Sequence, residues 1–330
     1  MRHPGRTPPF RTATGDIVPG SIAEAFYLPL GGVDQWVMIR GENLDNPPLI
    51  HLHGGPGFSE TRLLRHFNAD LERRFTVVYW DQRGAGRSFS PTMPRSSMTI
   101  EQFISDLDDL VEHVCTRLRR DAVALSGHSW GSALGVLYTR RHPRKVRVYV
   151  GSGQIGDWSA ADAASYAYTL AEAQRRNNRK AIDDLRAIGR PPYSVRSLWT
   201  ERMWLQRLDG QLNLRALWTI GRIALGGHES SIFDLPRQFR GFRFSIEAMW
   251  DEVSRLNLLA EAPELAVPVC FFLGRRDHFV PPETSMEYFE ALTAPSKQLL
   301  WFDESGHQPF MDEPAKFNRA MVDIVRPLAV

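Results

Sequence analysis

The sequence predicts an α/β fold in which helices cover both faces of a mostly parallel sheet, with an all-helical cap inserted into it. Three observations predict this class. Apolar strand patterns alternate with helical patterns from about residue 61, strand patterns disappear between about 155 and 250, and the alternation then resumes. We therefore expect a flexible tail over 1–20, a core formed by 21–154 and 251–330, and a helical cap over 155–250.

The first part of the core begins with short strands. They are expected near residues 22–28, 35–39, 48–53 and 76–80, and the first two form a predicted hairpin that turns at Gly31-Gly32. Helical patterns near 61–73 and 99–119 then alternate with strands beginning near residues 122 and 146. Residue types suited to a helix N-terminus are clustered before the second helix, at Ser97, Thr99 and Glu101.

The cap is predicted from helical patterns separated by breakers, which include Gly210, Gly226-Gly227 and Pro236. After the cap, the sequence predicts a strand over 267–274, a helix over 283–292, a strand over 298–302 and a final helix near 314–325. Because these strands follow helices, they are expected to extend the same parallel sheet.

Composition excludes several classes of protein. The 330 residues are 43% hydrophobic and 24% charged, and a net charge of +2 arises from 40 basic and 38 acidic residues, so neither nucleic acid nor an anionic membrane is expected as a partner. Cys115 and Cys270 fall in a predicted helix and strand and are interpreted as reduced core thiols. With no signal peptide and no membrane span in the sequence, we expect a cytoplasmic protein. The oligomeric state is left open.

The stretch GHSWGS, residues 127–132, separates a predicted strand from a predicted helix. Gly127 and Gly131 lack the side chains that would collide in so tight a turn, and Ser129 would project at the helix N-terminus. The helix dipole and free amide groups there favour developing negative charge. Ser129 is therefore the candidate nucleophile.

A nucleophilic serine needs a base and a carboxylate that orients the base. Asp277 follows the strand that ends near Gly274, and His307 follows the strand that ends near Phe302. The alternative acid is Asp157, on the loop after an earlier strand. His51 and His53 alternate along a strand and resemble a metal pair, but no third ligand is apparent, so no metal and no cofactor is expected.

The stretch HGGPG, residues 53–57, directly follows a predicted strand. Such a glycine-rich turn can direct a backbone N–H at a substrate oxygen. We expect the N–H groups of Gly55 and Trp130 to form an oxyanion hole; the alternative is an ordinary Gly-Pro turn.

Together with YWDQRGAGRS (79–88), GRRDHFVPP and ESGHQPFMDEP, these stretches resemble the proline iminopeptidase-like serine peptidases of the α/β-hydrolase superfamily. The resemblance covers about 48–150 and 265–315 and implies an eight-stranded, mostly parallel sheet with an inserted cap. It also implies that Arg83 anchors its loop. Gly84-Ala85-Gly86 is not a dinucleotide fingerprint, because no third glycine follows at the required spacing.

The resemblance implies a serine hydrolase acting through an acyl-enzyme on a small-molecule or short-peptide substrate, with release of N-terminal Pro or small apolar residues as the leading activity. Relatives bind the substrate's amino terminus with acidic cap residues; the candidates here are Glu201 and Glu247. The alternatives are an esterase, lactonase or amidase acting on an apolar small molecule and, less favoured, a non-enzymatic ligand receptor. Ten aromatic residues of the cap suit an apolar pocket: Trp158, Tyr166, Tyr168, Trp199, Trp204, Trp218, Phe233, Phe242, Phe244 and Trp250.

Overall fold

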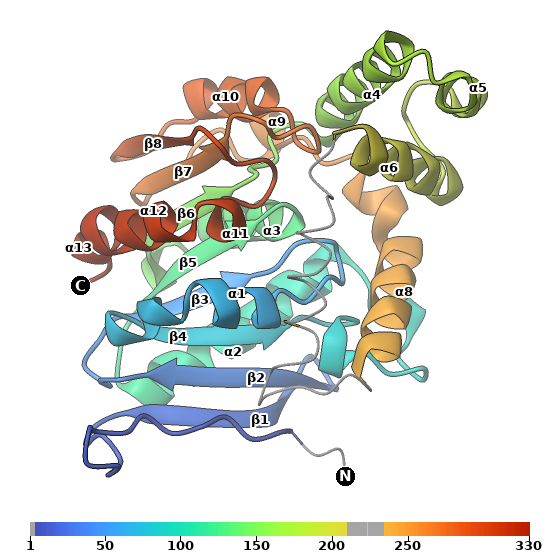
Figure 1. Cartoon of the computed structure of the whole chain (residues 1–330). Coiled ribbons are helices and arrows are strands. Elements are labelled where there is room, and N and C mark those ends of the chain that lie inside the picture. The colour runs from blue at the N-terminus through green and yellow to red at the C-terminus, as the bar shows by residue number, and fades with distance from the viewer. Residues whose placement is uncertain (1–3, 210–222, 224–233) are drawn as a thin grey trace.

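The sheet contains eight strands in the order β1-β2-β4-β3-β5-β6-β7-β8. The computed structural model describes residues 4–209, 223 and 234–330, and Figure 1 shows their arrangement. Strands β3 to β8 run parallel to one another, whereas β2 is antiparallel to both β1 and β4. The strands are β1 (Ile22–Leu30), β2 (Val33–Gly41), β3 (Pro48–Leu52), β4 (Thr76–Asp81), β5 (Val123–His128), β6 (Val146–Ser152), β7 (Val269–Gly274) and β8 (Lys297–Phe302). The predicted α/β fold with a mostly parallel sheet is confirmed.

The first two strands form the predicted hairpin. Their register pairs Ile22 with Gly41 and Leu30 with Val33. The turn requires positive φ angles, which are 51° at Gly31 and 78° at Gly32, and glycine adopts such angles without a Cβ clash.

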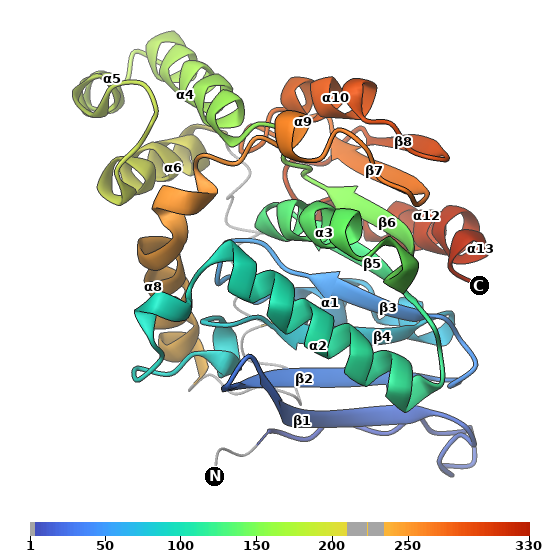
Figure 2. The same cartoon turned by 180° about the vertical axis from the view of Figure 1, so that it is seen from behind.

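Helices cover both faces of the sheet, as the two views in Figures 1 and 2 show. One face carries α2 (Ile100–Leu118), α3 (Trp130–Arg141), α9 (Leu258–Glu261) and α10 (Pro282–Ala291). The opposite face carries α1 (Thr61–Phe67), η1 (Ala69–Arg73), α11 (Pro309–Asp312), α12 (Pro314–Ala320), the π-helical turn η6 (Met321–Val325) and α13 (Arg326–Ala329). Each face has its own apolar cluster, which explains why the central strand β5 is buried at every residue.

Local sequence signals account for the helix ends. Thr99 accepts a hydrogen bond from the backbone N–H of Gln102 and so caps α2, as the sequence predicts. Asn178 caps α5 (Arg179–Ile188) in the same way, through the N–H of Ala181. Short 3₁₀ turns complete the loops of the core at η2 (Gly86–Ser88), η3 (Arg95–Ser97) and η4 (Pro143–Lys145).

The segment predicted as the cap is helical in its described part. Its helices are α4 (Trp158–Arg175), α5 (Arg179–Ile188), α6 (Val195–Asp209) and α8 (Leu235–Val253). The last helix continues past the predicted boundary at residue 250. Helices α4 to α6 project beyond the sheet at the upper right of Figure 1, and α8 descends beside the loops that follow β3 and β4. Hydrogen bonds from α8 hold it there: Gln238 donates to the carbonyl of Ser59, and Arg237 to that of Phe89.

Residues 4–20, part of the segment expected to be a flexible tail over 1–20, contact β2 and the loop after β4. In residues 4–20, the carbonyl of Pro4 accepts hydrogen bonds from Trp36 Nε1 at 2.7 Å and Arg87 Nη1 at 2.6 Å. Arg40 donates to the carbonyl of Pro8 at 2.7 Å and lies over the ring of Phe10. A sequence pattern rich in Pro and Gly does not reveal these contacts with side chains of β2 and of the loop after β4.

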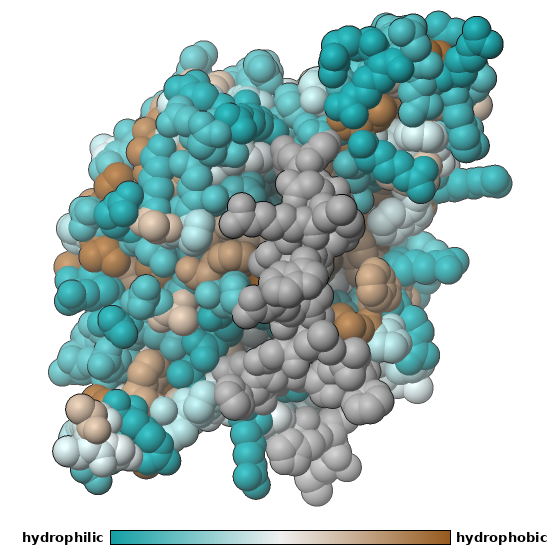
Figure 3. Space-filling view, viewed as in Figure 1, coloured by the Kyte–Doolittle hydropathy of each residue, from teal (hydrophilic) through white to brown (hydrophobic). Residues whose placement is uncertain are grey.

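The view in Figure 3 shows a mostly hydrophilic face on which apolar residues are scattered. Among the described residues, no helix is both long and apolar enough to cross a membrane. Cys115 and Cys270 are both free thiols, as predicted from their places in a helix and a strand.

Candidate active site

Ser129 occupies the sharp turn between β5 and α3, with φ 54° and ψ −120°. Such a backbone conformation costs a non-glycine residue roughly 1–3 kcal/mol. No side chain fits at the two glycines that flank this turn, Gly127 and Gly131. A Cβ at Gly131 would lie 2.0 Å from the carbonyl oxygen of Leu52, and one at Gly127 would lie 2.4 Å from that of Gly131. The turn leaves Ser129 partly exposed between buried residues.

The structure brings Asp277 and His307 together. Asp277 Oδ2 lies 2.8 Å from His307 Nδ1, and Asp277 Oδ1 accepts the backbone N–H groups of Phe279 and Val280 at 2.9 Å each. Because a carboxylate only accepts, His307 Nδ1 carries the proton and Nε2 is the nitrogen left to accept one. The Phe279 ring stacks on the His307 ring, with centroids 5.3 Å apart.

Asp157, the alternative acid, is used elsewhere. Its Oδ1 accepts the N–H of Ala160 and so caps α4, and its Oδ2 accepts from the side chain of Asn257 at 2.8 Å. The position after β6 therefore starts a helix, and the structure pairs His307 with Asp277 instead.

The HGGPG turn lies against the serine. A Cβ built on Gly54 would be 3.3 Å from Ser129 Cβ. Gly55 has φ 116°, and in the described part of the chain its N–H meets no hydrogen-bond acceptor. Trp130 is the first residue of α3, where a backbone N–H has no partner within the helix. Both expected oxyanion donors thus retain an N–H that a ligand can use.

His51 and His53 do not form a pair. His51 Nε2 contacts Glu60 Oε2 at 2.9 Å, whereas both nitrogens of His53 have other partners. The N–H of Gln82 approaches His53 Nε2 at 3.1 Å, which leaves His53 Nδ1 to donate to the carbonyl of Gly54 at 2.9 Å. The buried ring of His53 is therefore a neutral imidazole, and burial lowers its pKa.

Arg83 anchors the loop after β4 to α2 and to the hairpin turn, as the resemblance implies. Arg83 binds Asp106 with two hydrogen bonds of 2.8 Å and donates to the carbonyls of Leu30 and Gly31. Gln82 on the same loop accepts from Trp130 Nε1 at 3.0 Å. The loop therefore connects the hairpin turn to the helix that begins at the serine.

Sequence reasoning missed Glu60 and assigned no partner to His128. Glu60 Oε1 lies 2.6 Å from His128 Nδ1 and accepts the N–H of Gly54 at 3.2 Å. His128 Nε2 lies 2.8 Å from the carbonyl oxygen of His307. No sequence spacing indicates this network, because its members come from the segment after β3, the end of β5 and the loop after β8, which only the fold brings together.

Gly153 also contacts the site without a sequence signal. It has φ 51°, and a Cβ there would lie 2.8 Å from His307 Cε1. The absence of a side chain after β6 therefore makes room for the imidazole ring.

The two cap glutamates differ in their surroundings. Glu201 is completely buried in α6 and accepts from Thr169 at 2.9 Å and from Arg202 at 3.0 Å. Arg202 also pairs with Asp162 at 2.6 Å. Glu247 instead lies on the surface of α8 and pairs with Arg243, one turn away. Only Glu201 belongs to a buried charged cluster.

That cluster, formed by Asp162, Glu201 and Arg202, contains two carboxylates and one guanidinium. Burial raises the pKa of Asp162 to about 6; Arg202 opposes this shift and Glu201 adds to it. The Arg202 guanidinium lies 5.4 Å from the ring centroid of Phe279. The Phe279 ring therefore contacts both the cluster and His307.

Aromatic residues connect the cap to the HGGPG turn. Phe242 contacts Phe58 at 5.6 Å and Trp199 at 5.3 Å between ring centroids, both edge to face. Of the other six predicted pocket aromatics in the described part of the chain, four are buried core residues, namely Trp158, Tyr166, Trp204 and Trp250. Trp218 and Phe233 lie outside the described residues.

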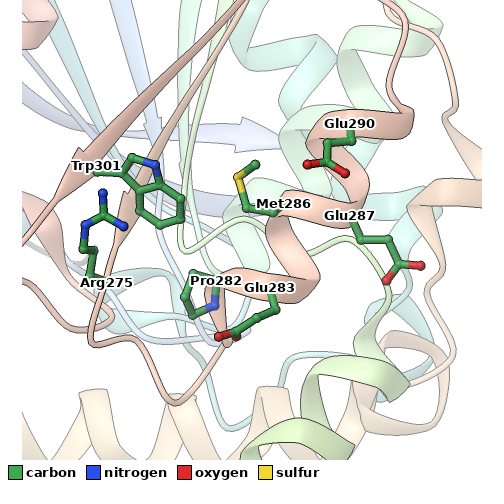
Figure 4. Close-up of a pocket in the computed structure, with 7 residues that line it drawn as sticks. All are labelled: Arg275, Pro282, Glu283, Met286, Glu287, Glu290 and Trp301. Carbon is green, nitrogen blue, oxygen red and sulfur yellow. The ribbon is translucent and has the colours of Figure 1, made fainter.

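A separate pocket of about 550 Å³ lies between α10 and the β7–β8 edge (Figure 4). Its lining combines three acidic side chains with Met286 and with Trp301, whose ring is covered by Arg275 at 4.4 Å. None of the predicted site residues lines it.

Comparison with known proteins identifies the class of the fold. Residues 47–314 match the family described as alpha/beta hydrolase fold. This match covers most of the 330 residues, and the chain therefore belongs to the α/β-hydrolase fold family.

Its relatives include named aminopeptidases. The chain is 32% identical over 302 residues to the probable aminopeptidase YbaC of Bacillus subtilis (strain 168), covering 90% of this chain and 94% of that protein. It is 24% identical over 297 residues to the proline iminopeptidase of Heyndrickxia coagulans, covering 87% and 93%. The crystal structure of a proline iminopeptidase-related protein from Thermus thermophilus has the same fold, with a TM-score of 0.67 at 21% identity over 94% of this chain and all of that one. The resemblance found from motifs is confirmed.

Proposed function

We propose that the chain is a serine hydrolase in which Ser129, His307 and Asp277 act as nucleophile, base and orienting acid. The observation that carries this proposal is the combination of a serine held at φ 54° on a strand-to-helix turn with an Asp277–His307 contact of 2.8 Å. The strain at Ser129 supports the proposal because such strain persists where function requires it.

In the proposed reaction, Ser129 Oγ attacks the substrate carbonyl carbon while its proton passes to His307 Nε2. The carbonyl oxygen becomes an oxyanion that accepts the N–H groups of Gly55 and Trp130. When the bond to the leaving group breaks, the proton on Nε2 passes to that group and an acyl-enzyme remains. Water then attacks the ester carbonyl carbon as His307 Nε2 takes one of its protons, the bond to Oγ breaks, the proton passes to Oγ, and the acid product leaves with Ser129 regenerated.

We further propose a proline iminopeptidase-like aminopeptidase that releases N-terminal Pro or small apolar residues. Names of relatives support this, and so does the cluster of Asp162, Glu201 and Arg202. With both carboxylates ionised, its net charge is −1, which suits the ammonium group of a free amino terminus. Tyr193 adds a buried hydroxyl that has no hydrogen-bond partner among the described residues and lies near the cluster.

A substrate panel tests this assignment. Prolyl-naphthylamide is compared with its N-acetyl derivative, which keeps the scissile amide but removes the cation. Burying a charge without its partner costs about 3 to 5 kcal/mol, so acetylation should reduce kcat/KM by roughly two to four powers of ten. Equal rates on both amides would contradict recognition of the ammonium group.

The second candidate is an esterase, lactonase or amidase that acts on an apolar small molecule. It is favoured by the position of Arg202, which already pairs with both carboxylates, and by the aromatic contacts of Phe58, Phe242 and Trp199. Rapid turnover of short acyl esters with inert amides would establish this candidate. Failure of Ser129 to react with a fluorophosphonate would instead favour a ligand receptor.

A further inference from the structure

Glu60 places a buried carboxylate where three parts of the candidate site meet. Its side chain is 1% exposed. It contacts the N–H of Gly54 in the HGGPG turn, Nδ1 of His128 next to the serine, and Nε2 of His51 on β3, at 3.2, 2.6 and 2.9 Å. A carboxylate removed from water requires such donors, so Glu60 holds these three groups in place.

Hydrogen-bond chemistry defines the charge of His128. Its Nδ1 faces the Glu60 carboxylate and its Nε2 faces the carbonyl oxygen of His307 at 2.8 Å. Both partners accept hydrogen bonds, and an imidazole donates from both nitrogens only when it is protonated. Although burial opposes both charges, contact between the two groups lowers the pKa of Glu60 and raises that of His128.

The resulting imidazolium lies beside the proposed base. The ring centroids of His128 and His307 are 4.6 Å apart. His128 also holds the main chain of His307, whereas Asp277 holds the other side of the ring through Nδ1. The base is therefore fixed from two directions by groups of opposite charge.

We propose that Glu60 and His128 form a buried ion pair that aligns the base loop and the oxyanion turn with Ser129 and keeps a positive charge beside the His307 ring. Both are positioning residues, since each acts through another group. This inference rests on the proposed serine-hydrolase function. The positive charge on His128 opposes protonation of His307. Activity therefore extends to lower pH than it would without that charge.

Titratable groups face this pair and the base from each packed element. Asp277 and Asp312 face His307 from the loop after β7 and from α11. His51 and the neutral His53 face Glu60 from the end of β3. The ring of Phe310 covers His128 at 5.2 Å. Arg202 of α6 approaches from the cap, where its guanidinium lies 5.4 Å from the Phe279 ring centroid.

The central test is Glu60→Gln, which keeps the shape of the side chain and its ability to hydrogen-bond but removes the charge. His128 then loses its counterion and becomes neutral near pH 7. We expect kcat to fall about tenfold with little change in KM. We also expect the acidic limb of the kcat/KM profile to move up by about one pH unit, because the opposing charge is gone. An unmoved limb, or one that moves down, would overturn the proposal.

Glu72→Gln is the matched control. Glu72 is another buried carboxylate, and it pairs with Arg40, Arg65 and Tyr79 rather than with any group of the site. Loss of that charge should lower the melting temperature without moving the pH profile. A shift as large as that of Glu60→Gln would mean that any buried charge produces the effect, and would overturn the proposal.

Nitrogen-15 NMR of the histidine rings tests the charge directly in the wild-type chain, with Glu60 in place. The His128 signals, assigned with His128→Gln, should show two protonated nitrogens at pH 7.5. A neutral ring at that pH would overturn the proposal. Reaction of wild-type Ser129 with a fluorophosphonate reports separately on the proposed function, so the two failures remain distinguishable.

Discussion

Single residues show how much of the site depends on backbone position. Ser129 has φ 54°, and the Cβ distances at Gly127 and Gly131 leave no space for any other residue in the turn. His307 has a carboxylate at Nδ1 and an aromatic ring against its face. Each of these contacts limits the ring to one orientation, which is what proton transfer at a defined atom requires.

If Ser129 and His307 act as one unit, their losses should not add. Ser129→Ala and His307→Ala are each expected to reduce kcat by roughly four to six powers of ten, and the double variant should be scarcely slower than either. Steady-state kinetics on an activated ester measures this. Multiplicative losses in the double variant would mean that the two residues act in separate steps.

Gly153→Ala should reduce activity through the base. The added Cβ would lie 2.8 Å from His307 Cε1, and the backbone has φ 51°. Displacement of the ring by part of an ångström is expected to lower kcat by at least about tenfold, with a smaller change in KM.

Gly32→Ala is the control for that variant, since Gly32 has φ 78° and open space around its Cβ position. It should show the backbone penalty of about 1 kcal/mol in unfolding experiments and normal kinetics. Comparable losses of kcat in both variants would attribute the effect to strain rather than to contact with His307.

At the scale of elements, α4 and α6 carry charged side chains that pair with one another inside the cap. Asp162 on α4 and Glu201 with Arg202 on α6 meet in the cap interior. The buried residues of α4 and α6 include Asp162 and Glu201, and Arg202 of α6 joins the two helices through its contact with Asp162. Buried charges of this kind reduce stability unless fully paired, so their presence indicates a role other than packing.

Asp162→Asn tests this cost. Burial raises the pKa of Asp162 from 3.8 to about 6, so the folded state binds its proton more tightly than the unfolded chain does. The folded state is therefore favoured below about pH 4 and loses that advantage as pH rises through about 6. Relative to the asparagine variant, the wild type should lose about 3 kcal/mol of unfolding free energy between pH 4 and 7.5.

Urea denaturation at several pH values measures that difference. Asp183→Asn, at an exposed position of α5, is the control and should follow the wild type at every pH. A wild type and Asp162→Asn variant with parallel stability curves would show that Asp162 titrates as an ordinary carboxyl group.

At the scale of the whole molecule, the candidate site combines residues of the core with residues of the cap. The core loops after β3, β5, β7 and β8 contribute the HGGPG turn, Ser129, Asp277 and His307. The cap contributes the charged cluster and the aromatic contacts of Phe242 and Trp199. If the proposed function holds, we therefore expect chemistry and selectivity to come from different segments of the sequence.

Exchanging the cap should change selectivity alone. Replacement of residues 155–253 by the corresponding segment of the Heyndrickxia coagulans proline iminopeptidase should bring the substrate preference of that relative while Ser129 still reacts with a fluorophosphonate. An unchanged preference would place selectivity in the core loops.

The sequence alone determined the sheet, the hairpin at Gly31-Gly32, the elbow at Ser129 and the order of the site residues. These features depend on local patterns, since apolar alternation, glycine spacing and strand ends are properties of neighbouring residues. The candidate site residues are expected to lie close together, because parallel strands present their carboxyl ends at one edge of the sheet.

Only the tertiary structure decided the partners of buried polar groups. Glu60 and His128 are 68 positions apart, Arg202 meets Asp162 from another helix, and Pro4 accepts from Trp36 and Arg87. A short sequence window contains no information on such pairs, because a buried donor or acceptor requires some partner but not one at a particular distance along the chain. The fold selects that partner when it removes both groups from water.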